Sequence, residues 1–123
     1  MKSAIDWRIN TETQLYTIKI NEAAELDLEN AGDYIAYELL NPQAAENTVR
    51  GIREQVNKLQ NFPTGHELDD DPILAELGVR RTYYKEYKIF YTVDQEHHVV
   101  NVVRILHMLV DSRVRLYRTF HIK

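Results

Sequence analysis

One stretch of the chain decides the fold, and it reads Tyr87-Lys-Ile-Phe-Tyr-Thr-Val-Asp94, Gln-Glu-His-His, Val99-Val-Asn-Val-Val-Arg-Ile-Leu-His107 and Met-Leu-Val-Asp111. Two runs rich in β-branched and aromatic residues flank a short polar turn, which predicts a β-hairpin. Because successive side chains of a strand point to opposite faces, one face should be apolar and carry Ile89, Tyr91, Val93, Val103 and Ile105. The other face should carry two cations, Lys88 and Arg104, the second of them among Val100, Val102 and Leu106.

The segments before the hairpin predict two more strands and two helices. Residues 15–20 alternate apolar and polar side chains, as a strand does, and residues 79–84 form another strand. Apolar residues at helical spacing predict a helix over residues 22–40 and a second helix over residues 42–60. Asn41-Pro42 separates them, because proline disfavours helix in the preceding residue and suits the first position of the next helix.

Together these elements predict an α+β fold with the order β-α-α-β-β-β. A small antiparallel β-sheet has an N-terminal helical hairpin packed on one face, and its other face is at least partly open. Residues 66–77 should form an acidic loop with one helical turn, and the tail, residues 112–123, suits either a strand or a short helix. We expect residues 15–123 to form a single domain. Residues 1–14 are expected to be an N-terminal extension whose alternating side chains would suit an extra strand, namely Ile5, Trp7 and Ile9.

The composition limits the class of protein. Hydrophobic residues make up 44% of the 123 residues, which is enough for a core and fits one domain. The chain has no cysteine, so disulfides and thiolate chemistry are excluded. The longest apolar run is too short to cross a bilayer, and no signal peptide is recognisable, so we expect a cytoplasmic protein.

Charge is unevenly distributed along the chain. Residues 1–77 contain 6 Lys/Arg and 15 Asp/Glu, a net charge of −9, whereas residues 78–123 contain 9 and 4, a net charge of +5. One interpretation is that the basic half has a polyanionic or acidic partner. The other is self-neutralisation, in which the acidic helices pack beside the basic sheet.

The residues argue against most kinds of catalytic site. Neither Ser3 nor Ser112 lies in a nucleophile elbow, so a Ser-His-Asp hydrolase is not expected. His97-His98 and Asp69-Asp70-Asp71 lack the spacing of metal ligands, and four scattered glycines exclude a phosphate-binding loop. We therefore expect neither a metal nor a cofactor.

Cations remain as the candidate functional residues. On or between the predicted strands lie Arg80, Arg81, Lys85, Lys88 and Arg104. If the register brings several of them onto one face, they could contact phosphates and stabilise the charge that develops during phosphodiester cleavage. His107, at the end of its strand, could then donate a proton. The alternative is that these cations pair with acids of the protein itself or of an acidic partner.

Several segments in order resemble the RelE/ParE superfamily of toxins from type II toxin–antitoxin modules, which include plasmid stabilisation systems. The resemblance covers about residues 15–111. It is carried by Ala23-Ala-Glu-Leu-Asp-Leu28, Asp33-Tyr-Ile-Ala36, Asn41-Pro-Gln-Ala-Ala45, Leu59-Gln-Asn-Phe-Pro63, Gly78-Val-Arg80, Tyr87-Lys-Ile-Phe-Tyr-Thr-Val-Asp94, and Val103-Arg-Ile-Leu-His107 with Asp111. The order and spacing of these segments make the resemblance specific, and it implies the same fold.

This resemblance implies a growth-inhibiting toxin that a cognate antitoxin neutralises. RelE-like members are metal-independent endoribonucleases that cleave mRNA on the ribosome, whereas ParE-like members poison DNA gyrase. A RelE-like enzyme would use Lys88, Arg104 and His107 as catalytic residues, with Lys88 standing where many relatives have an arginine. The expected contacts to a nucleic acid or another target are Arg80, Arg81, Lys85, Arg113 and Arg115. The long helical hairpin favours the ParE side.

The chain departs from the family at Met108-Leu-Val110, where many relatives have a glycine and basic residues. This departure supports an alternative, a degenerate and non-toxic member that only binds an antitoxin, provided that Leu109 and Val110 prove exposed. Antitoxins of this type usually wrap an extended or helical segment around the toxin, so the helical grooves and the basic tail are the expected docking surface. A homodimer through Trp7 is a further expectation.

Overall fold

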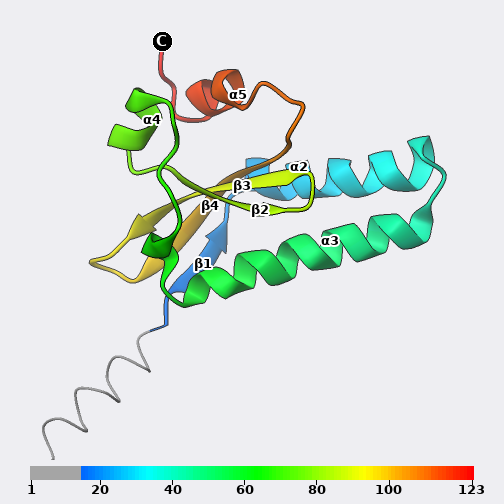
Figure 1. The fold of residues 1–123 in the computed structure, drawn as a ribbon, viewed down its shortest axis with the longest axis horizontal. Helices are drawn as coiled ribbons and strands as arrows, with labels where there is room; N and C mark the ends of the chain where they lie inside the picture. The colour runs from blue at the N-terminus through cyan, green and yellow to red at the C-terminus, as the bar shows by residue number, and fades with distance from the viewer. Residues whose placement is uncertain (1–14) are drawn as a thin grey trace, which may run out of the picture.

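A computed structural model describes residues 15–123, so the expected N-terminal extension and the Trp7 contact lie outside the described residues. The elements, in chain order, are β1 (Thr17–Ile20), α2 (Glu22–Asp33), α3 (Pro42–Asn57), α4 (Pro72–Glu76), β2 (Arg80–Tyr84), β3 (Tyr87–Asp94), β4 (Val99–His107) and α5 (Ser112–Thr119) (Figure 1). A π-helical turn, Tyr34–Glu38, continues α2. The predicted order is confirmed, and no helix within these residues is long and apolar enough to cross a membrane.

The four strands form one sheet in the order β1-β4-β3-β2. The last three strands make the antiparallel meander that the sequence predicts. β1 lies at the sheet edge and runs parallel to β4, with Thr17 opposite Val99. A parallel pair needs a crossover connection, and the helices between the two strands supply it.

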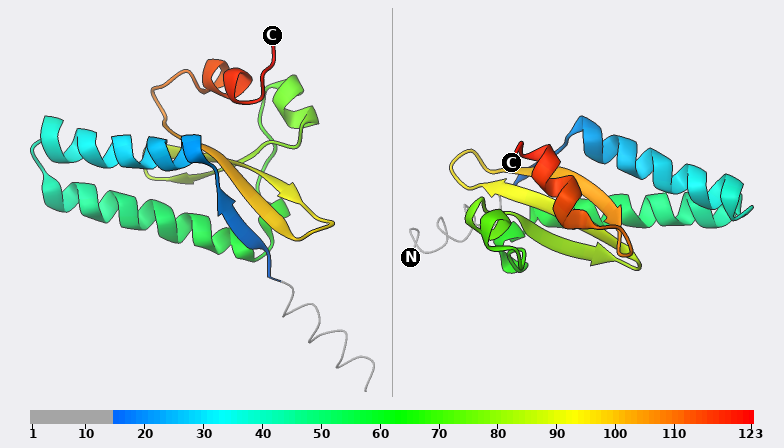
Figure 2. Two further views of the ribbon diagram at one scale, coloured as in Figure 1. Left: turned by 180° about the vertical axis from the view of Figure 1, so that it is seen from behind. Right: turned by 90° about the horizontal axis from the view of Figure 1, so that it is seen from above.

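α2 and α3 form the predicted helical hairpin, lie side by side and cover one face of the sheet (Figures 1 and 2). Each helix begins at an asparagine cap, because the side chains of Asn21 and Asn41 accept hydrogen bonds from Ala24 N at 2.8 Å and Ala44 N at 3.1 Å. Their apolar stripes meet the sheet in one buried cluster, formed by Ala24, Leu28, Ala31, Ile52, Val56, Leu59, Tyr87, Ile89, Tyr91, Val100, Val102 and Ile105.

A β-bulge between β3 and β4 changes which side chains share a face. Tyr91 pairs with Val102, while the preceding residue of β3 pairs with Arg104, so Val103 is an extra residue in β4. The alternation of β4 shifts by one residue at this point. The prediction that Val103 lies under the helical hairpin is therefore wrong, and so is the prediction that Val100 and Val102 face the other way.

The second face of the sheet is not left open, because α4 and α5 pack on it. Leu116 of α5 is fully buried there against a second cluster, formed with Leu74, Val79, Phe90, Val103 and Leu106. Tyr117, Phe120 and Ile122 add partly buried apolar area. The tail, for which the sequence suits either a strand or a helix, is therefore a short helix that covers the cation-bearing face.

Candidate functional site

Three of the expected functional cations belong to the sheet face that α4 and α5 cover. The strand register sets Arg81 and Arg104 opposite Phe90 on its two sides, and Lys88 opposite Leu106. Phosphate chemistry on this face would need guanidinium and ammonium groups that are free to bind a ligand. The partners of each cation therefore decide what the face can do.

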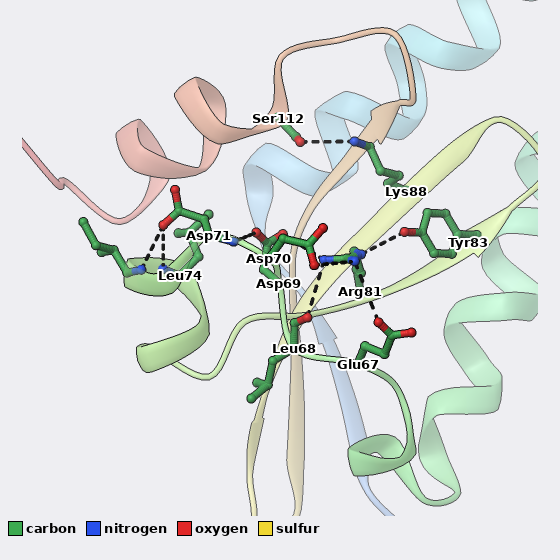
Figure 3. A network of polar contacts seen from close by, with 11 residues as sticks. Glu67, Leu68, Asp69, Asp70, Asp71, Leu74, Arg81, Tyr83, Lys88 and Ser112 are labelled. Carbon is green, nitrogen blue, oxygen red and sulfur yellow. Dashed lines mark hydrogen bonds and ion pairs between the residues drawn. The ribbon is translucent and has the colours of Figure 1, made fainter.

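Arg81 is held by the acidic loop (Figure 3). Its guanidinium lies 3.2 Å from Asp70, 3.7 Å from Asp69 and 3.9 Å from Glu67. Arg81 Nε also donates a hydrogen bond to the Tyr83 hydroxyl at 2.8 Å. Burial disfavours the charged guanidinium, but the hydrogen bonds with Tyr83 and Asp70 outweigh it and raise the pKa of Arg81. Self-neutralisation, one of the two interpretations of the uneven charge, holds for this residue.

Arg104 is held by Asp27 of α2 in a two-pronged ion pair. Arg104 Nε and Nη2 donate to the two carboxylate oxygens of Asp27, each at 2.7 Å, and both side chains are largely buried. Hydrogen bonding to Asp27 outweighs burial and raises the pKa of Arg104. Asp27 also accepts the backbone N–H of Ile105 at 2.9 Å. Arg104 therefore links α2 to β4, and two of its guanidinium nitrogens already donate to Asp27.

Lys88 lies beneath the start of α5 (Figure 3). Its Nζ is 3.3 Å from Ser112 Oγ and 5.8 Å from the centre of the Phe90 ring. Within residues 15–123, Lys88 forms no ion pair. The Lys88 ammonium therefore keeps a charge that no acidic residue of the described chain neutralises.

Arg113 is engaged by Asp71, the N-cap of α4. Arg113 Nε lies 3.0 Å from the Asp71 carboxylate, which also accepts the Tyr117 hydroxyl at 2.9 Å and the backbone N–H groups of Ile73 and Leu74. Burial acts to raise the pKa of Asp71, but these hydrogen bonds and the Arg113 charge together lower it. The cluster fastens α5 to α4.

Arg80 and Lys85 mark the two ends of β2. Arg80 Nη1 donates to the His66 carbonyl at 2.6 Å, which ties the acidic loop to the strand. Lys85 sits in the turn before β3 with a φ of 51°, and its Nζ lies 5.5 Å from the centre of the Tyr84 ring. Lys85 is exposed, so it remains available to a target.

His107 does not join Lys88 and Arg104. Its ring packs edge-on against Tyr87, with centres 5.2 Å apart, and Tyr87 belongs to the helix-side cluster. His107 Nδ1 accepts the backbone N–H of Leu109 at 3.1 Å. Together with Arg115, His107 lines a cleft of about 370 Å³ between α2 and the segment that follows β4. The expected catalytic residues are thus divided between the two faces of the sheet.

Reasoning from the sequence missed two participants, Asp27 and α5. Asp27 lies on the same helical stripe as Ala24 and Leu28, which are buried, so it is an acid at a core-facing position. A buried acid on a helix and an arginine on a core-like strand are a signal for a pair across the two elements. The sequence of α5 gives no comparable signal for its position, because the spacing of its apolar residues suits a strand as well as a helix.

Comparisons with known proteins agree with this architecture. Residues 18–111 match the family described as the ParE toxin of type II toxin-antitoxin system, parDE. Among curated proteins, no sequence matches this chain significantly. The solved structures it resembles include one of the chromosomal ParDE system from P. aeruginosa, with 22% identity, a TM-score of 0.64, and coverage of 77% of this chain and 98% of that one.

Two further structures share the fold. The RelBE2 toxin–antitoxin complex from Mycobacterium tuberculosis has 18% identity and a TM-score of 0.57, covering 77% of this chain and 93% of that one. A mutant of the E. coli toxin RelE in the free state has 15% identity and a TM-score of 0.59, covering 89% and 99%. The family match spans well over half of the chain. The chain therefore belongs to the ParE toxin family of type II toxin–antitoxin systems.

Proposed function

We propose that this toxin inhibits DNA gyrase, as ParE-like members of the superfamily do, and does not cleave mRNA as RelE-like members do. The observation that carries the proposal is the separation of the candidate catalytic residues. The Arg104 guanidinium is already bound by Asp27, and the His107 ring packs on Tyr87, whose side chain lies on the opposite face of the sheet from Lys88. Cleavage of a phosphodiester needs free cations and a proton donor aimed at one point, whereas here the Arg104 guanidinium is occupied and His107 packs on the other face of the sheet.

The pairing of other cations supports the same proposal. Arg81 and Arg113 are bound by acids, and Arg80 holds a backbone carbonyl. Binding to a nucleic acid gains affinity from cations that are free to replace counterions. Of the five expected target contacts, Lys85 and Arg115 are the exposed ones without an ion pair inside residues 15–123, and we assign them as candidate contacts to a protein target.

Induced expression without an antitoxin tests the mechanism. We expect growth arrest, loss of supercoiling by gyrase in the presence of the purified toxin, and no new mRNA ends by primer extension. The Lys88→Ala and His107→Ala variants should retain gyrase inhibition. If instead mRNA is cut, and cutting is lost in Lys88→Ala, Arg104→Ala and His107→Ala at normal folded yield, the RelE-like mechanism replaces the one proposed.

Neutralisation by an antitoxin is the second part of the proposal. A cleft of about 870 Å³ runs along α2 and α3, and its lining combines apolar side chains, among them Leu26 and Val49, with the acids Glu22, Glu25, Glu29 and Asp33. Leu26 is 56% exposed on this surface, and an amphipathic helix or an extended segment of an antitoxin fits such a groove. The RelBE2 structure, which shares this fold, is itself that of a toxin–antitoxin complex.

A matched pair of variants tests the groove. The probe is the product of a small reading frame adjacent to the gene, co-expressed with the toxin. Leu26→Asp should abolish co-purification, whereas Leu15→Asp, at a similarly exposed leucine (50%) outside the cleft, should leave it intact. Equal loss in both variants, or in neither, would contradict the groove.

A non-toxic, antitoxin-binding member is the second candidate function. The departure at Met108-Leu-Val110 favours it in part, since Leu109 is 87% exposed and Met108 is 49% exposed, whereas Val110 is half-buried and does not meet the expectation. Apolar side chains stand in the solvent where relatives have cations, and large exposed apolar groups suit a binding surface. Normal growth at verified soluble expression, with intact antitoxin binding, would select this candidate over gyrase inhibition.

A further inference from the structure

The cleft that contains His107 and Arg115 has features that neither gyrase inhibition nor mRNA cleavage accounts for. It lies between α2, the ends of β3 and β4, and the segment that leads into α5. We name it the Tyr34–Leu109 cleft after the two exposed residues at its rim, which are 54% and 87% exposed. Its volume of about 370 Å³ is in the range of sites that hold one or two side chains of a ligand.

The lining of the Tyr34–Leu109 cleft is largely apolar. Ala31, Ile105 and Leu106 are buried and also belong to the two core clusters, so this part of the lining is rigid. Leu109 and Val110 add aliphatic surface at the mouth. Burying a large apolar side chain against this lining is favourable, because both apolar surfaces are then removed from water.

Hydrogen-bonding groups converge on the same space. His107 Nδ1 accepts the Leu109 N–H, so the ring proton is on Nε2, which can donate to a ligand. Tyr87 presents a phenol, and burial, then the charge of Glu86 and the neighbouring Tyr34, raise the pKa of Tyr87 and keep it protonated. The cleft therefore offers donors for an acceptor group on the ligand.

One cation without an ion pair in the described part of the chain lines the cleft. Asp27 lines it, but the Asp27 carboxylate is already neutralised by Arg104 at 2.7 Å. Arg115 is exposed and forms no ion pair within residues 15–123. A carboxylate that enters the cleft would meet one uncompensated guanidinium and the His107 N–H.

We propose that the Tyr34–Leu109 cleft binds a peptide segment of a partner protein, which places a large apolar side chain in the cleft and a single neighbouring carboxylate on Arg115 and His107. The proposal stands apart from the proposed function, because it concerns a ligand chemistry and is tested without any toxicity readout. In this complex the exposed Leu109 side chain would cover the inserted apolar side chain at the mouth of the cleft.

A nucleic acid fits this cleft poorly. One free arginine is a small cation density for a polyphosphate, which gains its affinity from several replaced counterions. A ligand with one carboxylate and mostly apolar contacts matches the single free arginine and the apolar lining that the described residues give this cleft.

Titration of the isotope-labelled protein, followed by NMR, tests the proposal with a small probe, N-acetyl-leucyl-glutamate amide. Saturable shifts are expected at Tyr34, His107 and Leu109, with an affinity in the millimolar range for so few atoms. The neutral probe N-acetyl-leucyl-glutamine amide should bind about tenfold more weakly, as should Arg115→Gln towards the glutamate probe, because each loses a charge-assisted hydrogen bond.

Arg118→Gln is the matched control. It removes the same charge from the same helix, but Arg118 does not line the cleft, so the affinity should change by less than about twofold. Equal binding of the two probes, an equal effect of the two variants, shifts located elsewhere or no saturable shift would each overturn the proposal. Tighter binding of adenosine monophosphate at the same residues would overturn it in favour of a nucleotide site.

Discussion

Asp27 is the residue on which the position of Arg104 depends, and its removal is a sharp test of that role. We expect Asp27→Asn to lower the free energy of unfolding by about 3 kcal/mol, because it leaves a largely buried guanidinium without a counter-charge. Urea unfolding measures the loss. Glu29→Gln, an exposed acid of the same helix, is the control and should change stability by less than about 0.5 kcal/mol. A loss of similar size in both variants would contradict the special role of Asp27.

We expect Asp71 to make the stability of the fold depend on pH. Burial opposes ionisation, but the Tyr117 hydroxyl, the α4 backbone N–H groups and Arg113 lower the pKa of Asp71 below its ordinary value of 3.8. A lowered pKa in the folded state contributes stability above the unfolded pKa, and that contribution disappears as the pH falls through the folded pKa. Asp71→Asn keeps a good N-cap but removes the charge.

The stability difference between the wild type and Asp71→Asn should therefore be largest near pH 6. It should shrink as the pH falls below the ordinary carboxyl pKa of 3.8. Thermal melts between pH 6 and pH 2.5 measure this trend. Glu76→Gln, an exposed acid at the end of α4, should show no comparable dependence. A difference that stays constant over this range would mean that Asp71 acts only as a cap.

At the scale of elements, the fit of α3 on β2 is set by Gly51. A Cβ built on Gly51 would lie 2.1 Å from the Tyr84 ring, so Tyr84 packs directly on the helix backbone. Gly51→Ala should destabilise the protein by about 2 kcal/mol, even though alanine favours the helix by about 1 kcal/mol. Gly65→Ala, where the nearest atom is 3.6 Å away, is the control. Gly51→Ala at wild-type stability would contradict the close packing.

Which elements the sequence could predict depends on how local their causes are. The cap at Asn21, the break at Asn41-Pro42 and the alternation of β3 are local, and they predicted the helical hairpin and the meander correctly. The bulge at Val103 arises from the pairing of two strands, so the pattern of one strand could not reveal it. α5 became a helix because its Leu116 is buried on the sheet, which is a tertiary cause.

The candidate site was predictable in its members and not in its geometry. Lys88 and Arg104 were expected on one face, and they do share it, but the acids that bind Arg81 and Arg104 come from distant segments of the chain. Long-range ion pairs leave no periodic trace in a sequence. The alternative of self-neutralisation follows from the charge of the two halves, and the pairs at Asp27 and Asp71 are of that kind.

For the whole molecule, the paired cations predict weak and only slightly salt-dependent binding of RNA. Each phosphate contact adds about 0.7 to the slope of log K against log salt for a single strand, so binding through Lys85 and Arg115, the two expected target contacts that form no ion pair within residues 15–123, gives a slope near 1.4. Fluorescence anisotropy with a labelled RNA measures it. A triple variant that releases Arg81, with Glu67→Gln, Asp69→Asn and Asp70→Asn, should steepen the slope. A wild-type slope above about 4 would indicate a phosphate patch.

The parallel edge pair has a consequence for how the chain folds. β1 lies near one end of the described chain and its partner β4 near the other, so a ribosome must make Val99 to Val102 before Thr17 to Ile20 can dock. Closing so long a loop is slow, whereas the β3–β4 hairpin needs only a short turn. Pulsed hydrogen exchange should therefore protect the amides of Ile89 and Ile105 before that of Ile18. A nascent toxin would then stay unfinished, and unable to act, until the ribosome had moved past β4.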